Sequence, residues 1–177
     1  MRPSDHELVE RIAEGEDDAL ALLMRRHAAP LMRFAASYLR SADDADEVLQ
    51  DVFLRARGAF RRGARPNELA GWLFRVTVNR CRTRQRRWWP FVGGTRAESA
   101  LAGASAPPTA GDLEWREEID KALTELSPVL REAFLLRHVE GMDYEEMARV
   151  TGSRIPALKM RVARARLQLR LRLEDLR

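Results

Sequence analysis

Apolar residues recur every three or four positions along almost the whole sequence, and this spacing is what most limits the possible folds. The clearest example is residues 147–172, MARVTGSRIPALKMRVARARLQLRLR, which contain eight Arg and Lys and neither Asp nor Glu. A period near 3.6 is typical of an amphipathic helix. No segment alternates apolar and polar residues as a strand does, and no hairpin dipeptide separates two apolar runs. The sequence therefore predicts an all-α protein.

The helical spacing is interrupted once, at residues 88–112 (WWPFVGGTRAESALAGASAPPTAGD), which are rich in Gly, Ala, Ser and Pro. Such composition is typical of a flexible linker. We therefore expect two small helical domains, residues 1–87 and 113–177, of four helices each. The apolar spacing and the capping residues place the first seven helices at about 5–14, 16–39, 42–57, 67–87, 113–126, 128–141 and 143–152, and the last helix after its cap Ser153.

Several classes of function are disfavoured by the composition. The chain has no apolar run near the roughly 20 residues of a membrane span, and its polar, acidic start differs from a signal peptide, so we expect a cytoplasmic protein without direct membrane insertion. One cysteine, Cys81, makes no internal disulfide. The three histidines fall on different predicted helices, and there is no phosphate loop or nucleophile elbow. We expect no catalytic residue, metal, cofactor or small-molecule substrate.

The distribution of charge is more informative than the net charge of +4. Seven Arg and no acidic residue lie between Glu68 and Glu98, and eight basic and no acidic residues lie between Glu146 and Glu174. One such block could equally be a solvated helix surface. Two blocks on amphipathic helices favour two contacts with a polyanion such as nucleic acid.

Residues 143–174 have the pattern of a helix-turn-helix, in which a second helix enters the DNA major groove. The first helix is short and ends at Gly152, and the second is longer and basic. Its apolar stripe consists of Ile155, Leu158, Val162, Ala165 and Leu169. Met160, Ala163 and Arg164 lie opposite this stripe, where they could approach base edges. The alternative is a coiled-coil or bundle segment, whose seam has the same spacing.

The fourth predicted helix also has two different faces. Arg75, Asn79, Arg82 and Arg86 share one side, whereas Leu73, Val76, Thr77 and Cys81 share the other. One face therefore packs, and the other is a basic stripe that contains an amide. A side-chain amide can hydrogen-bond an unstacked base, and the neighbouring arginines can hold a single-stranded backbone.

These motifs, in this order, resemble the sigma-70 family of bacterial RNA polymerase sigma factors, in particular the extracytoplasmic-function (ECF) group. The segments DADEVLQDVFLRARGAF and WLFRVTVNRCRTRQRR resemble the first sigma domain. The segments ALTELSPVLREAFLLRHVEGMDYEEMARVTG and KMRVARAR resemble the second. The resemblance implies a sigma factor that binds core RNA polymerase and directs promoter-specific initiation.

The resemblance also implies a role for individual residues. The polymerase clamp would contact Gln50, Asp51 and Arg55. The melted minus-ten element would be held by Arg61, Arg62, Asn67, Arg75, Asn79, Arg82 and Arg86. The minus-thirty-five duplex would be contacted by Arg137, Arg154, Lys159, Met160, Arg161, Ala163, Arg164 and Arg166, of which Arg161 and Arg166 fit phosphate contacts better than base contacts.

One segment departs from the family pattern. The segment Pro156-Ala157-Leu158-Lys159-Met160-Arg161 stands where many members have Gly-Thr-Val-Lys-Ser-Arg, so two hydroxyls are lost. This loss bears on which bases are read and not on whether DNA is read. The implied partners are core RNA polymerase, promoter DNA and an anti-sigma factor. Two rival hypotheses remain: a stand-alone helix-turn-helix regulator of duplex operators, and a helical interaction module that does not contact DNA.

Overall fold

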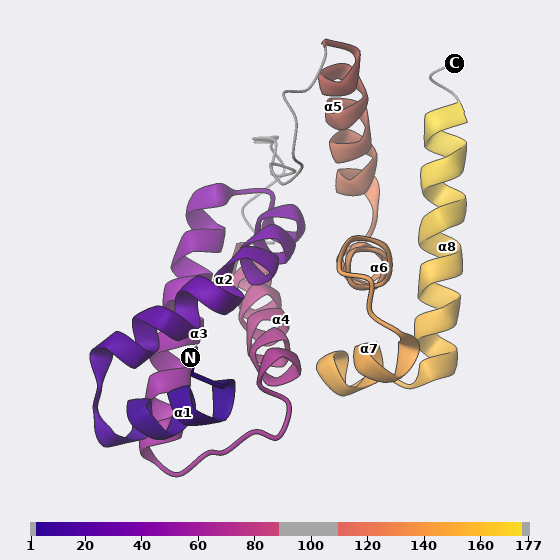
Figure 1. Cartoon of the computed structure of the whole chain (residues 1–177). Coiled ribbons are helices and arrows are strands. Elements are labelled where there is room, and N and C mark those ends of the chain that lie inside the picture. Colours follow the sequence, from indigo (N-terminus) through magenta and orange to yellow (C-terminus); the bar gives the residue numbers. More distant parts are fainter. Residues whose placement is uncertain (1–2, 89–109, 175–177) are drawn as a thin grey trace.

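The computed structural model of the chain describes residues 3–88 and 110–174, and it is built of helices (Figure 1). The first four are α1 (Asp5–Glu14), α2 (Asp17–Leu39), α3 (Ala42–Arg61) and α4 (Leu69–Trp88). They are followed by α5 (Ala110–Glu125), α6 (Pro128–Phe134), the π-helical turn η1 (Leu135–Val139), α7 (Tyr144–Thr151) and α8 (Ile155–Glu174). No strand occurs in the described ranges, which confirms the all-α prediction. Most of the predicted linker, residues 89–109, lies outside the described residues.

Local capping explains where several helices begin and end. The Ser4 hydroxyl accepts from the Glu7 amide at 3.2 Å while the Glu7 carboxylate accepts from the Ser4 amide at 2.6 Å, so α1 begins in a reciprocal capping box. Asp143 and Glu146 form the same arrangement at α7. That helix ends at Gly152, whose φ of +70° suits glycine because it has no Cβ.

The structure corrects three details of the predicted elements. Helix α3 continues to Arg61, beyond the predicted end, because Phe60 is fully buried and packs on Trp72 with ring centroids 5.5 Å apart. The predicted helix 128–141 changes into a π-helical turn at Leu135. Ser153, expected as the N-cap of the last helix, instead accepts a hydrogen bond from Arg161 at 2.9 Å, and α8 begins at Ile155.

Helices α1–α4, here called the N-terminal unit, surround a core of large apolar side chains. The largest fully buried ones are Leu8, Ile12, Leu23, Leu31, Phe34, Phe53, Phe60 and Leu73. Helices α5–α8 with η1, here called the C-terminal unit, pack α5 and α6 along α8 and bury Leu135, Leu136, Met147 and Leu158. The apolar stripes seen in the sequence thus become the buried side of the helices in each unit.

The two units lie against each other, which the sequence did not predict. Helix α4 packs on α7, and α2 packs on η1 and α6 (Figure 1). Buried apolar residues of both units belong to one continuous cluster. The contact brings α4, with its basic stripe, next to the helix-turn-helix.

Candidate nucleic-acid interface

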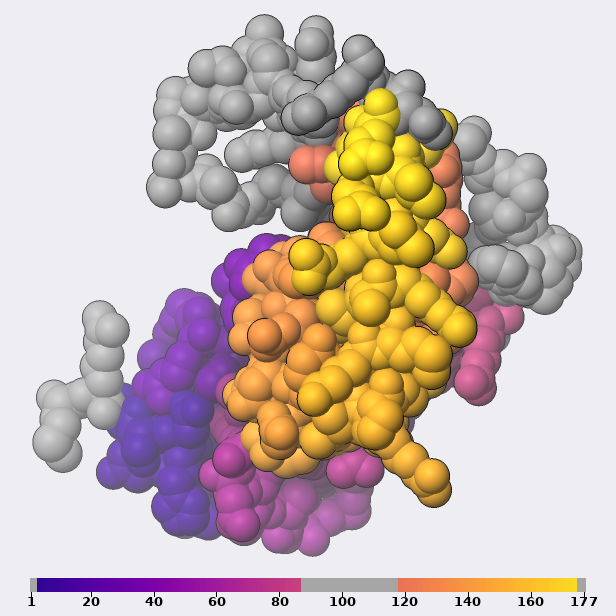
Figure 2. Space-filling view, turned by 90° about the vertical axis from the view of Figure 1, so that its right-hand side faces the viewer, coloured from indigo at the N-terminus to yellow at the C-terminus, as the bar shows by residue number. Residues whose placement is uncertain are grey.

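Helix α8 presents an exposed basic surface on the side away from its buried stripe. Leu158, Val162, Ala165 and Leu169 are all buried, as the spacing predicted, whereas Ile155, the first residue of α8, is half-buried. The predicted minus-thirty-five contacts Arg154, Lys159, Met160, Ala163, Arg164 and Arg166 are all exposed. Figure 2 shows α7 and α8, coloured orange to yellow, on the face turned to the viewer, in front of the N-terminal unit. The outward side of α8 is therefore open to a ligand as large as a duplex.

The turn between α7 and α8 is rigidly built, so the position of α8 is well defined. Buried Thr151 donates its hydroxyl proton to the Met147 carbonyl at 2.7 Å, and the Ser153 amide donates to the Thr151 hydroxyl at 3.1 Å. Gly152 supplies the left-handed residue between them. Arg161 is half-buried because it reaches back to Ser153, so it lies at the edge of the exposed surface and not at its centre.

Two of the predicted DNA contacts are brought together by an aromatic residue that sequence reasoning did not single out. The guanidinium carbon of Arg137 lies 5.1 Å from the ring centroid of Tyr144, and the Lys159 ammonium lies 5.6 Å from it. Arg137 also donates to the Met142 carbonyl at 2.7 Å. Cations over an aromatic face are favoured electrostatically. Tyr144 therefore restricts two long side chains at one end of the α8 surface.

Helix α4 has the two faces that its sequence predicted. Leu73, Thr77 and Cys81 are fully buried, and the Thr77 hydroxyl donates to the Leu73 carbonyl at 2.9 Å. Burial raises the pKa of the Cys81 thiol, which is therefore protonated and unreactive at neutral pH. On the opposite face Arg75, Asn79 and Arg86 are exposed. The amide of Asn79 thus stands between exposed arginines on the outer side of the helix.

Arg82, expected on the same stripe, has a different environment. Its Nε and Nη2 each donate to the Glu132 carboxylate of α6 at 2.7 Å, and its Nη1 donates to the Thr151 carbonyl at 3.3 Å. The hydrogen bond to Glu132 raises the pKa of Arg82, so the guanidinium stays charged. In this arrangement Arg82 joins the two units, and its guanidinium is not available to a phosphate.

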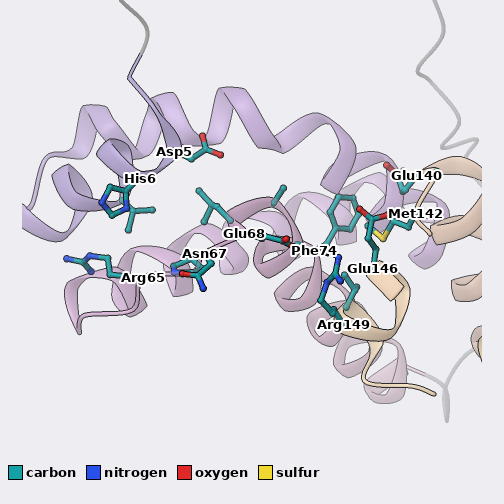
Figure 3. Close-up of a pocket in the computed structure, with 17 residues that line it drawn as sticks. Asp5, His6, Arg65, Asn67, Glu68, Phe74, Glu140, Met142, Glu146 and Arg149 are labelled. Carbon is teal, nitrogen blue, oxygen red and sulfur yellow. Dashed lines mark ion pairs between the residues drawn. The ribbon is translucent and has the colours of Figure 1, made fainter. Parts of the chain in front are cut away.

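The segment between α3 and α4 carries the remaining predicted minus-ten contacts. Arg61, Arg62 and Asn67 are exposed. Asn67 lines a cleft of about 860 Å³ that has walls from both units, as Figure 3 shows. Its lining includes four acidic side chains and two arginines, namely Asp5, Glu68, Glu140, Glu146, Arg65 and Arg149. Among the predicted DNA contacts only Asn67 is in the lining of this cleft. Because carboxylates outnumber arginines there, the cleft does not attract a polyanion.

A separate surface on α3 contains the predicted polymerase contacts. Gln50 and Arg55 are exposed, and the Asp51 carboxylate pairs with Arg55 at 3.0 Å and with Arg80 of α4 at 2.5 Å. Leu54 lies among them with 62 % of its surface exposed, the largest value among the large apolar residues that stand out as exposed. An isolated exposed leucine needs no special explanation, but one beside a predicted contact surface suits a protein partner. The signal in the sequence was Leu54's position off the buried stripe of α3.

No group of three or more His, Cys, Asp or Glu side chains in residues 3–88 and 110–174 is placed to hold a metal ion. None of the helices in those ranges is both long enough and apolar enough to cross a bilayer. His27 pairs with Asp5 at 2.9 Å, which is a structural role.

Comparison with known proteins places both units. Residues 23–90 match the family model for Sigma-70 region 2, and residues 116–169 match that for Sigma-70 region 4. The chain is 32% identical to the RNA polymerase sigma factor CarQ of Myxococcus xanthus over 95% of this chain and 97% of that protein. It is also 32% identical to the ECF RNA polymerase sigma factor SigM of Mycobacterium tuberculosis, over 94% of this chain and 83% of that protein.

Two solved structures are similar over nearly the whole chain. The structure of CnrH in complex with the cytosolic domain of CnrY has a TM-score of 0.71 and 27% identity, covering 97% of both chains. The sigma factor RpoE in complex with the anti-sigma factor NepR from Bartonella quintana has a TM-score of 0.65 and 28% identity, covering 91% of this chain and 98% of the other. The similarity extends across both units and is not limited to the helix-turn-helix.

Proposed function

The chain belongs to the sigma-70 family, among the ECF RNA polymerase sigma factors, and from this premise we propose that it reads a promoter through two separate surfaces. It acts as a sigma factor, which binds core RNA polymerase and directs transcription initiation. The single observation that carries the proposal is that one chain of this family has two exposed basic faces. One face is on α4 and contains the amide of Asn79, and the other is on α8 of the helix-turn-helix. The working units are residues 1–87 and 113–177, joined by residues 88–112.

The minus-thirty-five duplex binds the outward side of α8. Arg164 lies at the centre of this side, next to exposed Ala163, whose small side chain allows close approach to base edges. A guanidinium there can donate two hydrogen bonds to the O6 and N7 acceptors of guanine. Arg166 lies toward the edge, where it meets phosphates and fixes position without reading sequence.

The melted minus-ten element binds the outward side of α4 and the segment before it. Asn79 supplies a donor and an acceptor to an unstacked base, and Arg75 and Arg86 lie exposed on the same face to hold the backbone. Arg61, Arg62 and Asn67 extend this surface at the end of α3. Arg82 becomes part of this surface when its ion pair with Glu132 is broken.

Core RNA polymerase binds the α3 surface around Leu54, with Gln50, Asp51 and Arg55. The partners of the chain are thus core polymerase, promoter DNA and an anti-sigma factor, the last because the similar RpoE structure includes the anti-sigma factor NepR. The chain works in the cytoplasm, where polymerase transcribes, and it contributes binding and positioning in place of catalysis. It needs no cofactor and no small-molecule substrate.

The decisive experiment is run-off transcription with purified core polymerase on a library of promoter templates. The proposal expects that the chain directs initiation from a subset of templates that share two sequence elements. Failure to initiate from any template would refute it. A stand-alone regulator, the rival hypothesis, would instead protect a duplex operator from nuclease digestion without polymerase.

A further inference from the structure

Tyr144, the first residue of α7, contacts cations from two other segments of the C-terminal unit. Its ring is half-buried and packs against the core. The guanidinium carbon of Arg137, in η1, lies 5.1 Å from the ring centroid, and the ammonium nitrogen of Lys159, in α8, lies 5.6 Å from it. Both distances are within the roughly 6 Å over which a cation is attracted to an aromatic face. One ring therefore holds a cation of the second helix of the helix-turn-helix and a cation from outside that motif.

The backbone around Tyr144 is held on both sides of the residue. The Asp143 carboxylate accepts from the Glu146 amide at 2.7 Å, and the Glu146 carboxylate accepts from the Asp143 amide at 2.8 Å, so α7 begins in a capping box. Two residues before Tyr144, the Met142 carbonyl accepts from Arg137 at 2.7 Å. Arg137 is thus tied both to the ring and to the chain that leads into it. The ring has a defined position from which to hold a more flexible side chain.

Lys159 is the side chain that gains most from such a support. An ammonium group is a point charge on a flexible stem, so a free lysine reaches many acceptors and favours no particular one. Ordering it on DNA costs conformational entropy, and a contact made before binding removes part of that cost. Arg164, at the centre of the same surface, has no ring contact, hydrogen bond or ion pair of its side chain within the described ranges. The two basic residues of α8 are therefore prepared for DNA in different ways.

We propose that Tyr144 is a positioning residue for promoter recognition, whose ring aims Lys159 and Arg137 at neighbouring base pairs of the minus-thirty-five duplex. Because the two charged groups lie 5.1 and 5.6 Å from one centroid, they are at most about 11 Å apart, which is about three base pairs at 3.4 Å each. The placement of the cations follows from the described contacts, whereas the reading of bases rests on the proposed function. Without the ring both cations keep their charge and still meet phosphates, so Tyr144 sets sequence preference and not general affinity for DNA.

The test compares holoenzymes that contain the parent chain, Tyr144→Leu or Tyr144→Phe. Leucine keeps an apolar side chain against the core but has no ring, and phenylalanine is the matched control because it keeps the ring. Each holoenzyme binds promoters selected by the run-off experiment, in which the upstream element has been randomised, and sequencing of the bound fraction gives the base preference at every position. Arg137→Ala, Lys159→Ala and Arg164→Ala in the parent identify the position that each of these side chains reads.

We expect Tyr144→Leu to lower the base preference about two- to fivefold at the Arg137 and Lys159 positions, the factor that one cation over an exposed ring is worth. The preference at the Arg164 position and the salt slope of binding should stay those of the parent, and Tyr144→Phe should change none of these. An equal loss at all three positions would indicate a merely structural role, and an equal loss in Tyr144→Phe would assign the effect to the hydroxyl. Either result overturns the proposal, as does a preference that survives Tyr144→Leu.

A second measurement needs neither polymerase nor DNA. In nuclear magnetic resonance spectra of the free chain, the methylene protons beside the charged groups of Lys159 and Arg137 should be shifted upfield by the ring current of Tyr144. These shifts should persist in Tyr144→Phe and disappear in Tyr144→Leu, while the far-ultraviolet circular dichroism stays that of the parent. Unshifted protons in the parent would overturn the proposal even if the chain initiates transcription. Shifted protons in a chain that initiates from no template would refute the proposed function and, with it, the role in reading bases.

Discussion

Arg131 is expected to contribute more to stability than any other charged side chain at the contact between the units. It is 5% exposed, and its guanidinium donates to four main-chain carbonyls. Two are in the last turn of α5 and one directly follows that helix, namely Leu123, Thr124 and Leu126, at 2.8, 2.8 and 3.2 Å, and the fourth is Tyr38 at the end of α2, at 3.0 Å. Carbonyls at a helix end have no intrahelical partner. The Arg131 side chain therefore supplies hydrogen-bond donors to carbonyls at the ends of two helices, one in each unit, and so connects the units.

The informative substitution is Arg131→Met, which keeps an unbranched side chain of similar length but donates no hydrogen bond. Four buried carbonyls then lose their partner at a cost of about 1 kcal/mol each, or about 4 kcal/mol. Burial lowers the pKa of Arg131 to about 10, so the group is charged at neutral pH. Removing this buried charge recovers some desolvation energy, and the net loss should be about 3 kcal/mol.

The assay is urea unfolding followed by circular dichroism, with thermal unfolding beside it. A loss of about 3 kcal/mol corresponds to roughly 6–12 °C in Tm for a chain of this size. Arg154→Met is the control, because the Arg154 side chain is exposed and makes no hydrogen bond or ion pair with the described residues, and the substitution should change stability by less than about 0.5 kcal/mol. A loss below about 1 kcal/mol for Arg131→Met would refute the reasoning, since it would mean that the four carbonyls find other partners.

The remaining predictions concern surfaces and one titration. Arg164→Ala should cost the holoenzyme about 1–3 kcal/mol of binding free energy, measured with promoter variants, at one base position only. Arg166→Ala should weaken binding to all sequences alike and lower the slope of log K against log salt concentration by about one. Leu54→Ala should weaken core polymerase binding by more than about 1 kcal/mol in a fluorescence titration, while Leu171→Ala, at a residue 52% exposed in the other unit, should leave it unchanged. Burial and two nearby arginines lower the pKa of His138, so nuclear magnetic resonance should find its midpoint below 6.5, and Arg166→Ala should raise it. Because the unfolded chain then binds more protons, the contribution of His138 to stability should be present above pH 6.5 and lost as the pH falls; a midpoint at or above 6.5 would contradict this.

The helices and their faces could be predicted from the sequence because they depend on local physics. The spacing of Leu158, Val162 and Leu169 identifies a buried stripe whatever it packs against, and an exposed Arg164 follows from being opposite to it. Capping residues such as Ser4 and Asp143 act within one turn, so they also mark helix ends reliably. The family resemblance added roles to residues that otherwise are only polar surface, such as Gln50.

The tertiary structure alone decided which charged side chains form ion pairs between the two units. In the sequence, Arg82 and Arg86 have the same surroundings, yet one is paired with Glu132, which lies 50 positions away, and the other is exposed. Arg33 and Glu140 are separated by 107 positions, and nothing local connects them. An ion pair depends on the distance between its two charges in space, which helical periodicity does not encode. The sequence by itself determined which faces are basic, and only the packing of the units determined which of those cations are available to DNA.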